Sequence, residues 1–91
     1  MDPRQPFVSV LLPVYNAERY IAPAVESILA QTFADFEFLI LDDGSTDGSF
    51  EILQRYAAAD ARIRLRSRPN AGLVVTLNEM LADARGEYIA R

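Results

Sequence analysis

Two polar clusters follow the first two apolar runs of the chain. Pro13-Val14-Tyr15-Asn16 brings an aromatic ring and an amide, and Asp42-Asp43-Gly44-Ser45 brings two carboxylates. An aromatic face beside a carboxylate can hold a planar heterocycle, because the ring stacks and the carboxylate accepts an imino N–H. Uracil offers that donor at N3, whereas cytosine has a bare acceptor there and would be repelled. We therefore interpret Tyr15 and Asp43 as a candidate nucleoside site.

Residues in these clusters also have purely structural interpretations. Tyr15 could be a half-buried aromatic residue of the core, and Asn16 could cap the helix that follows it. Asp42 could be a buried partner of neighbouring loop amides rather than a ligand contact. Thr46 and Asp47 could do no more than cap the next helix, an interpretation that we favour for Asp47.

Other charged groups have simpler explanations than a ligand site. Glu18 and Arg19 are typical first-turn surface charges of a helix. A calcium loop over residues 42–49 is disfavoured, because this segment lacks the alternate acidic spacing and the terminal Glu of an EF-hand. The solvated face of an edge strand would account for a series of basic residues, Arg62, Arg64, Arg66 and Arg68.

Composition restricts the available chemistry to carboxylates, hydroxyls, amides and the backbone. The 91 residues include no Cys and no His, which excludes disulfides, thiolate chemistry, a Ser-His-Asp triad and His- or Cys-ligated zinc within this chain. Nine basic and thirteen acidic residues give a net charge of -4, so nucleic acid is not an expected partner.

The N-terminal residues 1–6 form a polar leader without the apolar core of a signal peptide. No apolar run approaches the roughly 18 residues that would span a bilayer. We therefore expect a cytoplasmic protein, and membrane association through residues outside this chain stays open.

The elements that must position the polar clusters alternate between strand and helix patterns. Apolar, β-rich runs predict buried strands at 7–12 and 36–41, a short edge strand at 63–65 and a fourth strand at 87–90. Helical spacing of apolar residues predicts one helix that begins near residues 19–22 and continues to 29, and a second at 49–59. The apolar stripe of the first helix begins at Tyr20. A third helix is predicted to end at Gly86, and its apolar stripe consists of Leu73, Leu77, Met80, Leu81 and Ala84.

This alternation predicts βαβ units with right-handed crossovers. The expected fold class is α/β, a Rossmann-like three-layer fold over residues 7–91 with a parallel sheet in the order third, second, first, fourth strand. In such a sheet ligands bind beyond the carboxyl ends of the strands, which is where both polar clusters fall. The outer edge of the fourth strand would lack a partner, so we expect a homo-oligomer formed by edge pairing or exchange of the last element.

Three longer segments carry a recognisable pattern: VSVLLPVYN at 8–16, SILAQTF at 27–33 and LDDGSTDGS at 41–49. Together they resemble family 2 glycosyltransferases of the GT-A fold. Asn70-Ala71-Gly72 and RGEYI at 85–89 are similar to that family's next two blocks, in the right order. Five blocks in register make a chance match improbable, and the resemblance covers nearly the whole chain.

The resemblance implies that the chain is the N-terminal half of a GT-A domain and binds a nucleotide-diphosphate sugar, with a UDP-sugar as the expected donor. Many relatives have an Arg-Asn pair in the third helix where this chain has Leu77-Asn78, so no contact of that Arg is carried over. The site residues that it implies are Pro13, Tyr15 and Asp43 in the nucleoside pocket, Asn16 and Glu18 nearby, Asp42 in support of the loop or near the ribose, and Asn70 and Gly72 over the nucleotide.

Family members continue into an Asp-x-Asp motif that holds Mg²⁺ or Mn²⁺, and they later supply a carboxylate general base. Neither is present in these residues, so we expect a domain truncated before that motif and a chain that is inactive alone. The resemblance implies single displacement with inversion for the complete enzyme: the base deprotonates an acceptor hydroxyl, which attacks the anomeric carbon while the metal stabilises the leaving diphosphate. The alternative is a non-catalytic module that binds nucleotide or assembles with itself.

Overall fold

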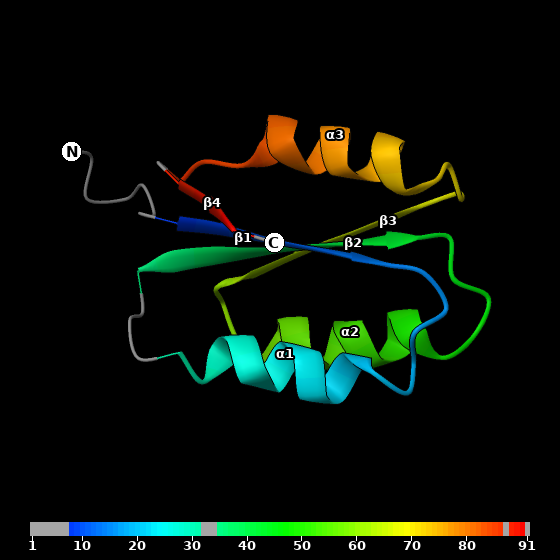
Figure 1. Ribbon diagram of the computed structural model, residues 1–91. Helices are drawn as coiled ribbons and strands as arrows, with labels where there is room; N and C mark the ends of the chain where they lie inside the picture. Colours follow the sequence, from blue (N-terminus) through cyan, green and yellow to red (C-terminus); the bar gives the residue numbers. More distant parts are fainter. Residues whose placement is uncertain (1–7, 32–34, 87, 91) are drawn as a thin grey trace.

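A computed structural model describes residues 8–31, 35–86 and 88–90, in which a parallel sheet lies between two layers of helices (Figure 1). The elements are β1 (Val8–Val14), α1 (Ile21–Leu29), β2 (Phe36–Asp43), α2 (Ser49–Ala59), β3 (Ile63–Arg68), α3 (Leu73–Asp83) and β4 (Tyr88–Ala90). The strand order is β3-β2-β1-β4, with α3 on one face and α1 and α2 on the other. The predicted α/β class, Rossmann-like layers and strand order are confirmed.

The strands β2 and β3 are longer than predicted. β2 continues through Asp42 and Asp43, which we had assigned to a loop, and β3 continues from the predicted residue 65 to Arg68. The two strand ends pair with each other, and Asp43 lies opposite Arg68. Pairing between the strands therefore keeps these residues in the sheet, although their polarity is typical of a loop.

β1 also extends past its predicted end, through Pro13 to Val14. On one side β1 pairs with β2 over its whole length, whereas the described part of β4 pairs with residues 8–10 on the other side. Among the described residues Pro13 has a strand partner in β2 alone, and a proline at such a position need not remove a ladder hydrogen bond. The predicted strand positions Phe7 and Glu87 lie outside the described residues.

Two apolar cores cover the faces of the sheet. The larger core lies against α1 and α2, where Val25, Phe38 and Leu53 are fully buried. The smaller core lies under α3 and contains Leu11, Leu39, Leu41 and Met80. Every residue of β2 is buried, which accounts for the continuous apolar run from Phe36 and the absence of alternation in it.

The bounds of α1 and α2 agree closely with prediction, whereas α3 ends at Asp83, before the predicted end at Gly86, and the buried stripes of α1 and α3 differ. Tyr20 precedes α1 and is 71% exposed, so it does not belong to the buried stripe. In α3 the buried residues are Thr76 and Met80, whereas Leu73 and Leu81 are exposed. The reason is that α3 packs mainly on β1 and β2, so only a narrow face of the helix is buried.

No helix in the described ranges combines the length and the apolarity needed to cross a membrane.

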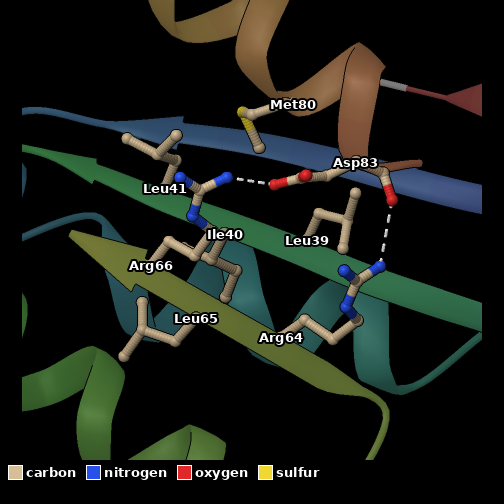
Figure 2. A pocket seen from close by; sticks show the side chains of 8 residues that line it. All are labelled: Leu39, Ile40, Leu41, Arg64, Leu65, Arg66, Met80 and Asp83. Carbon is tan, nitrogen blue, oxygen red and sulfur yellow. Dashed lines mark hydrogen bonds and ion pairs between the residues drawn. The ribbon is translucent and has the colours of Figure 1, made fainter. Parts of the chain in front are cut away.

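The arginines of β3 form only part of the solvated face that the sequence predicts, since Arg66 is exposed whereas Arg64 and Arg68 are partly buried. Arg64 Nη1 lies 3.1 Å from the carbonyl oxygen of Asp83, and Arg66 pairs with the Asp83 carboxylate, so both side chains are drawn toward α3 (Figure 2). They border a hollow of about 170 Å³ whose other lining includes Leu39 and Met80. The prediction is wrong for Arg64 and Arg68, because Asp83 and Glu79 of α3 lie above this edge of the sheet and bond these side chains.

Arg62 precedes β3 and was also predicted to be solvated. Its guanidinium instead lies 4.7 Å from the centre of the Phe36 ring and forms a 2.7 Å ion pair with Asp60. It therefore covers one end of the larger core with a cation above an aromatic ring.

Glu37 is a buried charge at the end of the sheet opposite the two polar clusters. Its carboxylate accepts hydrogen bonds from Ser9 Oγ, Arg64 Nη1 and the backbone N–H of Arg85. Ser9 Oγ in turn accepts the N–H of Gly86 at 2.8 Å, so the segment that leads into β4 is held against β1 and β2. The sequence pattern placed Glu37 in a buried strand without assigning it any role.

Candidate functional site

Five of the predicted site residues line one pocket, which lies at the carboxyl ends of β1 and β2 and beside the start of α3. The pocket measures about 220 Å³. Tyr15 is half exposed at 52%, so its ring is available for stacking. The predicted residues in the lining are Pro13, Tyr15, Asp43, Asn70 and Gly72, and they are joined there by Val14, Leu73 and Thr76.

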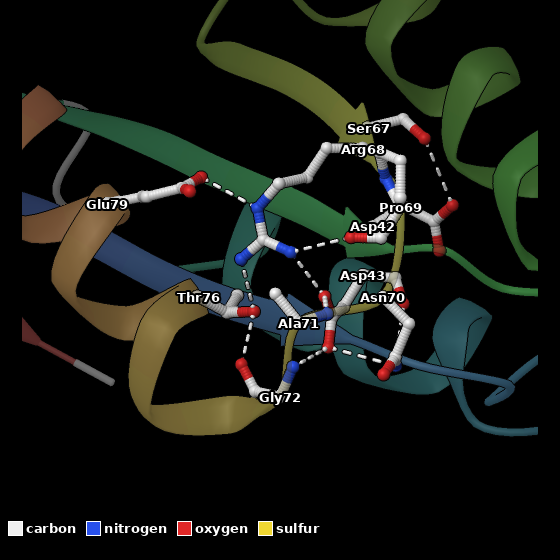
Figure 3. A network of polar contacts seen from close by, with 10 residues as sticks. All are labelled: Asp42, Asp43, Ser67, Arg68, Pro69, Asn70, Ala71, Gly72, Thr76 and Glu79. Atoms are coloured by element: carbon white, nitrogen blue, oxygen red, sulfur yellow. Dashed lines mark hydrogen bonds and ion pairs between the residues drawn. The ribbon is translucent and has the colours of Figure 1, made fainter.

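The Asp43 carboxylate accepts four hydrogen bonds (Figure 3). Oδ1 lies 2.5 Å from Arg68 Nη1 and 2.9 Å from the Ala71 nitrogen, and Oδ2 lies 3.1 Å from the Gly72 nitrogen and 3.2 Å from Asn70 Nδ2. Asp43 itself is only 5% exposed. The residues after β3 therefore fold over the end of β2 and fix the orientation of its last carboxylate.

Arg68 organises this network, although we did not predict it as a site residue. Besides Asp43, its guanidinium reaches Glu79 Oε2 and Thr76 Oγ1, each at 2.7 Å (Figure 3). Thr76 Oγ1 in turn donates a hydrogen bond to the carbonyl oxygen of Gly72 at 2.8 Å. The signal that could have identified Arg68 is register, because it lies opposite Asp43 where both strands end.

The same contacts control the charge of Asp43. Burial alone would raise the pKa of the Asp43 carboxyl, but the N–H groups of Ala71 and Gly72 and the Arg68 guanidinium together lower this pKa below its usual value of 3.8. Asp43 is therefore ionised at neutral pH and acts only as a hydrogen-bond acceptor.

Glycines allow the segment at 70–72 to approach β2 this closely. Gly44 has a φ of 72°, and a Cβ at that position would lie 2.5 Å from the backbone nitrogen of Asn70. Gly72 has a φ of 95° immediately before α3, a conformation that side chains rarely adopt. A larger residue at position 44 would push Asn70 away from Asp43.

Asn16 and Glu18 lie in a neighbouring hollow, together with Asp47, and are not part of the lining around Tyr15. Asn16 has a φ of 47°, its backbone N–H donates to Ser45 Oγ at 2.9 Å, and its Oδ1 accepts the N–H of Thr46 at 2.8 Å. The interpretation of Asn16 as a cap of α1 is wrong, because its side chain bonds the loop after β2 instead.

Glu18 and Asp47 support the start of α2. Glu18 Oε2 accepts the N–H of Gly48 at 2.8 Å, and Asp47 Oδ1 accepts the N–H of Ser49 at 2.9 Å. These bonds satisfy N–H groups that have no partner inside the helix, as the capping interpretation of Asp47 requires. Ser49 Oγ also accepts the N–H of Ala17 at 2.9 Å, so the loops after β1 and β2 are bonded together at several points.

Asp42 lies on the opposite face of the sheet from Asp43, because successive side chains of a strand alternate. It is 2% exposed, and its Oδ2 is 3.4 Å from Ser67 Oγ, while Oδ1 has no hydrogen-bond partner among the described residues. Asp42 is absent from the lining of the pocket around Tyr15.

The described residues do not fit a divalent metal site. They contain no group of three or more acidic side chains that could hold an ion together. Of the adjacent pair, Asp42 and Asp43 face opposite sides of the sheet, and the oxygens of Asp43 already accept four hydrogen bonds. This arrangement is suited to accepting N–H groups rather than to binding a cation.

Comparison with known proteins identifies relatives over the same residues that form the fold. The model of the family described as Glycosyl transferase family 2 matches residues 9–91. The putative glycosyltransferase EpsE of Bacillus subtilis is 44% identical over 88 residues, which cover 94% of this chain and 32% of that protein. The chain spans about a third or less of the length of the curated relatives that it matches.

Two solved structures share the fold closely. The mannosyltransferase PcManGT from Pyrobaculum calidifontis, in complex with GDP-Man and Mn²⁺, has a TM-score of 0.83 and 27% identity over 96% of this chain and 27% of its own. Residues 1–349 of S. aureus TarS, in complex with UDP, have a TM-score of 0.82 and 31% identity over 91% of this chain and 25% of their own. The fold is therefore that of part of a GT-A glycosyltransferase domain.

Proposed function

Because the chain belongs to glycosyl transferase family 2, we propose that it forms the part of a glycosyltransferase that binds the nucleoside of a nucleotide-diphosphate sugar. Support comes from the site itself, where a half-exposed Tyr15 ring and a fixed, ionised Asp43 carboxylate line one pocket. A stacking surface and an acceptor are what recognition of a base with an imino donor requires.

We propose uracil as the base and a UDP-sugar as the donor. Arg68, Ala71 and Gly72 use three acceptor positions of the Asp43 carboxylate, so at most one position, which the Asn70 amide uses in this structure, is left for a base. Uracil presents a single N3–H with carbonyls on either side, whereas guanine presents two adjacent donors and cytosine presents none at its N3. UDP in the TarS complex and GDP-Man in the PcManGT complex make uridine and guanosine nucleotides the natural pair to compare.

For the complete enzyme we propose transfer of the sugar to an acceptor hydroxyl with inversion at the anomeric carbon. The general base, and ligands for Mg²⁺ or Mn²⁺, would come from residues outside this chain, since the described residues do not fit a metal. Mn²⁺ in the PcManGT complex supports the metal requirement. Within this chain the proposed roles are limited to binding and orienting the nucleoside.

Titration of the purified chain with UDP, GDP and CDP, by calorimetry and by NMR, tests the base assignment. We expect UDP to bind most tightly and to shift the signals of Tyr15 and Asp43. Asp43→Asn removes the charge and one acceptor oxygen, which should weaken UDP binding by about tenfold to a hundredfold.

Asp35→Asn is the matched control, because Asp35 is exposed just before β2, at the other end of the sheet, and should leave UDP binding unchanged. Equal affinity for UDP and CDP, or shifts that avoid the pocket, would show that the assignment is wrong. Tighter binding of GDP than of UDP would reject uracil while keeping the nucleoside site.

A further inference from the structure

We propose that the Asn70 side chain occupies the position on Asp43 that the imino N–H of a base takes, so that binding displaces this side chain. The proposal rests on the proposed nucleoside site and assigns Asn70 the role of a specificity-determining residue. It follows from how the four hydrogen bonds on the Asp43 carboxylate are distributed.

The carboxylate has no acceptor position to spare in this structure. Each carboxylate oxygen has two lone-pair directions, so four donors fill the group. Arg68 and Ala71 use Oδ1, and Gly72 and Asn70 use Oδ2. A base that donates an imino N–H to Asp43 must therefore replace one of these four donors.

Three of the four donors are fixed. Ala71 and Gly72 donate from the backbone, in a segment that leads directly into α3. The Arg68 guanidinium is held by Glu79, by Thr76 and by the carbonyl oxygen of Pro69 in addition to Asp43. Moving any of them would disrupt several other contacts at once.

Asn70 is the donor that can leave. The residue is exposed, and the bond from its Nδ2 to Oδ2 is the longest of the four at 3.2 Å. Nδ2 also lies 3.1 Å from the backbone oxygen of Asp43. Both partners accept hydrogen bonds, so the amide nitrogen must face them, and one of its two hydrogens can keep the backbone bond while the other is released.

Displacement would involve the side chain alone, because the Asn70 backbone is held in place. Gly44 packs so closely that a Cβ on it would lie 2.5 Å from the Asn70 nitrogen, and Ala71 and Gly72 stay bonded to Asp43. A small rotation of the amide then opens Oδ2 toward the pocket that Tyr15 lines.

The exchange affects the affinities for the two kinds of base differently. A base with an imino donor replaces the Asn70 hydrogen bond with an equivalent one, whereas cytosine offers no donor at N3 and cannot compensate for its loss. Cytosine therefore leaves Asn70 on Asp43, and Asn70 lowers the affinity only for a base that displaces it.

Replacing Asn70 with Ala separates this role from simple support of the loop. We expect Asn70→Ala to bind UDP about fivefold more tightly, by the net value of one hydrogen bond, and to leave CDP binding unchanged. The matched control Asn78→Ala, at an exposed position in α3, should leave both affinities unchanged. In the unmodified chain, saturation with UDP should shift the side-chain amide signals of Asn70.

A structural role for Asn70 would instead weaken UDP and CDP binding together as the loop loosens. A parallel loss of this kind would overturn the proposal. An unchanged UDP affinity would also overturn it, as would a parallel gain in affinity for both nucleotides. If the unmodified chain binds UDP in preference to CDP, any of these results rejects the role of Asn70 alone. If the unmodified chain binds no nucleotide, the proposed nucleoside site fails, and the role of Asn70 fails with it.

Discussion

Asp43 and Arg68 lie opposite each other where β2 and β3 end, and their side chains form an ion pair, with Nη1 2.5 Å from Oδ1. Because both strands are fixed in the sheet, the pair holds the carboxylate at a constant position relative to Tyr15. The planar guanidinium also reaches Glu79 and Thr76 on α3, so one side chain joins the sheet to the helix beside the pocket.

Replacing Arg68 with Lys should weaken UDP binding by about tenfold. An ammonium group is a point charge and cannot reach Asp43, Thr76 and Glu79 in the fixed geometry of a guanidinium. Arg66→Lys is the matched control, since Arg66 lies on the same strand, is more exposed and pairs with Asp83 instead. Calorimetric titration of both variants measures the effect, and equal losses in the two would show that Arg68 has no special role.

Replacing Glu37 with Gln should lower the free energy of unfolding at neutral pH by about 1.5–3 kcal/mol, because the donors Ser9, Arg64 and the Arg85 backbone lose the charge and one of the two oxygens that accept from them. Urea unfolding measures this. Glu51→Gln, on the exposed surface of α2, should change it by less than about 0.5 kcal/mol.

The same residue predicts a dependence on pH. Burial raises the pKa of Glu37, but its hydrogen bonds and Arg64 lower it more, so the folded-state pKa is below the usual 4.5. A lowered folded-state pKa means that the contribution is complete above 4.5 and is lost as the pH falls through the folded-state value. The difference between the original chain and Glu37→Gln should therefore shrink below pH 4.5, and a constant difference would contradict this account.

The purified 91-residue chain should neither transfer sugar nor hydrolyse a nucleotide-sugar, whichever divalent metal is added. Its described residues contain no acidic cluster for a metal, and a missing general base alone costs about 10²–10⁴-fold in rate. A coupled assay for released UDP measures this. Metal-dependent release would require a carboxylate site among Asp42, Asp43, Asp47 and Glu18.

The chain should also self-associate at micromolar concentration. Within the described residues the outer edge of β4 pairs with no strand, and Ile89 and Leu81 are 44% and 49% exposed. Unpaired edges and exposed apolar side chains favour association. Sedimentation equilibrium measures the mass, and Ile89→Lys should shift it toward the monomer. A monodisperse 10.2 kDa species for the original chain would contradict the prediction.

The order of elements could be predicted because each depends on a local pattern. The apolar run at Phe36 and the helical spacing from Ser49 are readable in sequence, and right-handed crossovers then restrict the strand order. Strand ends could not be read in this way. Asp42 and Asp43 are typical of a turn, and they continue β2 because β1 pairs with Asp42 and β3 pairs with both as far as Arg68.

The site could be predicted in part for a related reason. Parallel strands bring their carboxyl ends to one edge, so Tyr15 and Asp43 were expected to meet. The role of Arg68 depends on Thr76 and Glu79 of α3 lying within reach of the end of β3, which no local pattern encodes. Alternation along a strand separates Asp42 from Asp43, but this became evident only once β2 was seen to include both.

The hydrogen bonds between the loops after β1 and β2 have a consequence for how donor preference could change during evolution. Asn16 bonds Ser45 and Thr46, and Ala17 bonds Ser49, so the two loops cannot move independently. The wall that includes Tyr15 is thereby constrained, whereas Leu73, beside Asn70, is exposed and contributes to no described core. Lineages that adapt to another base should therefore accumulate substitutions at Asn70 and Leu73 while the paired loops stay the same.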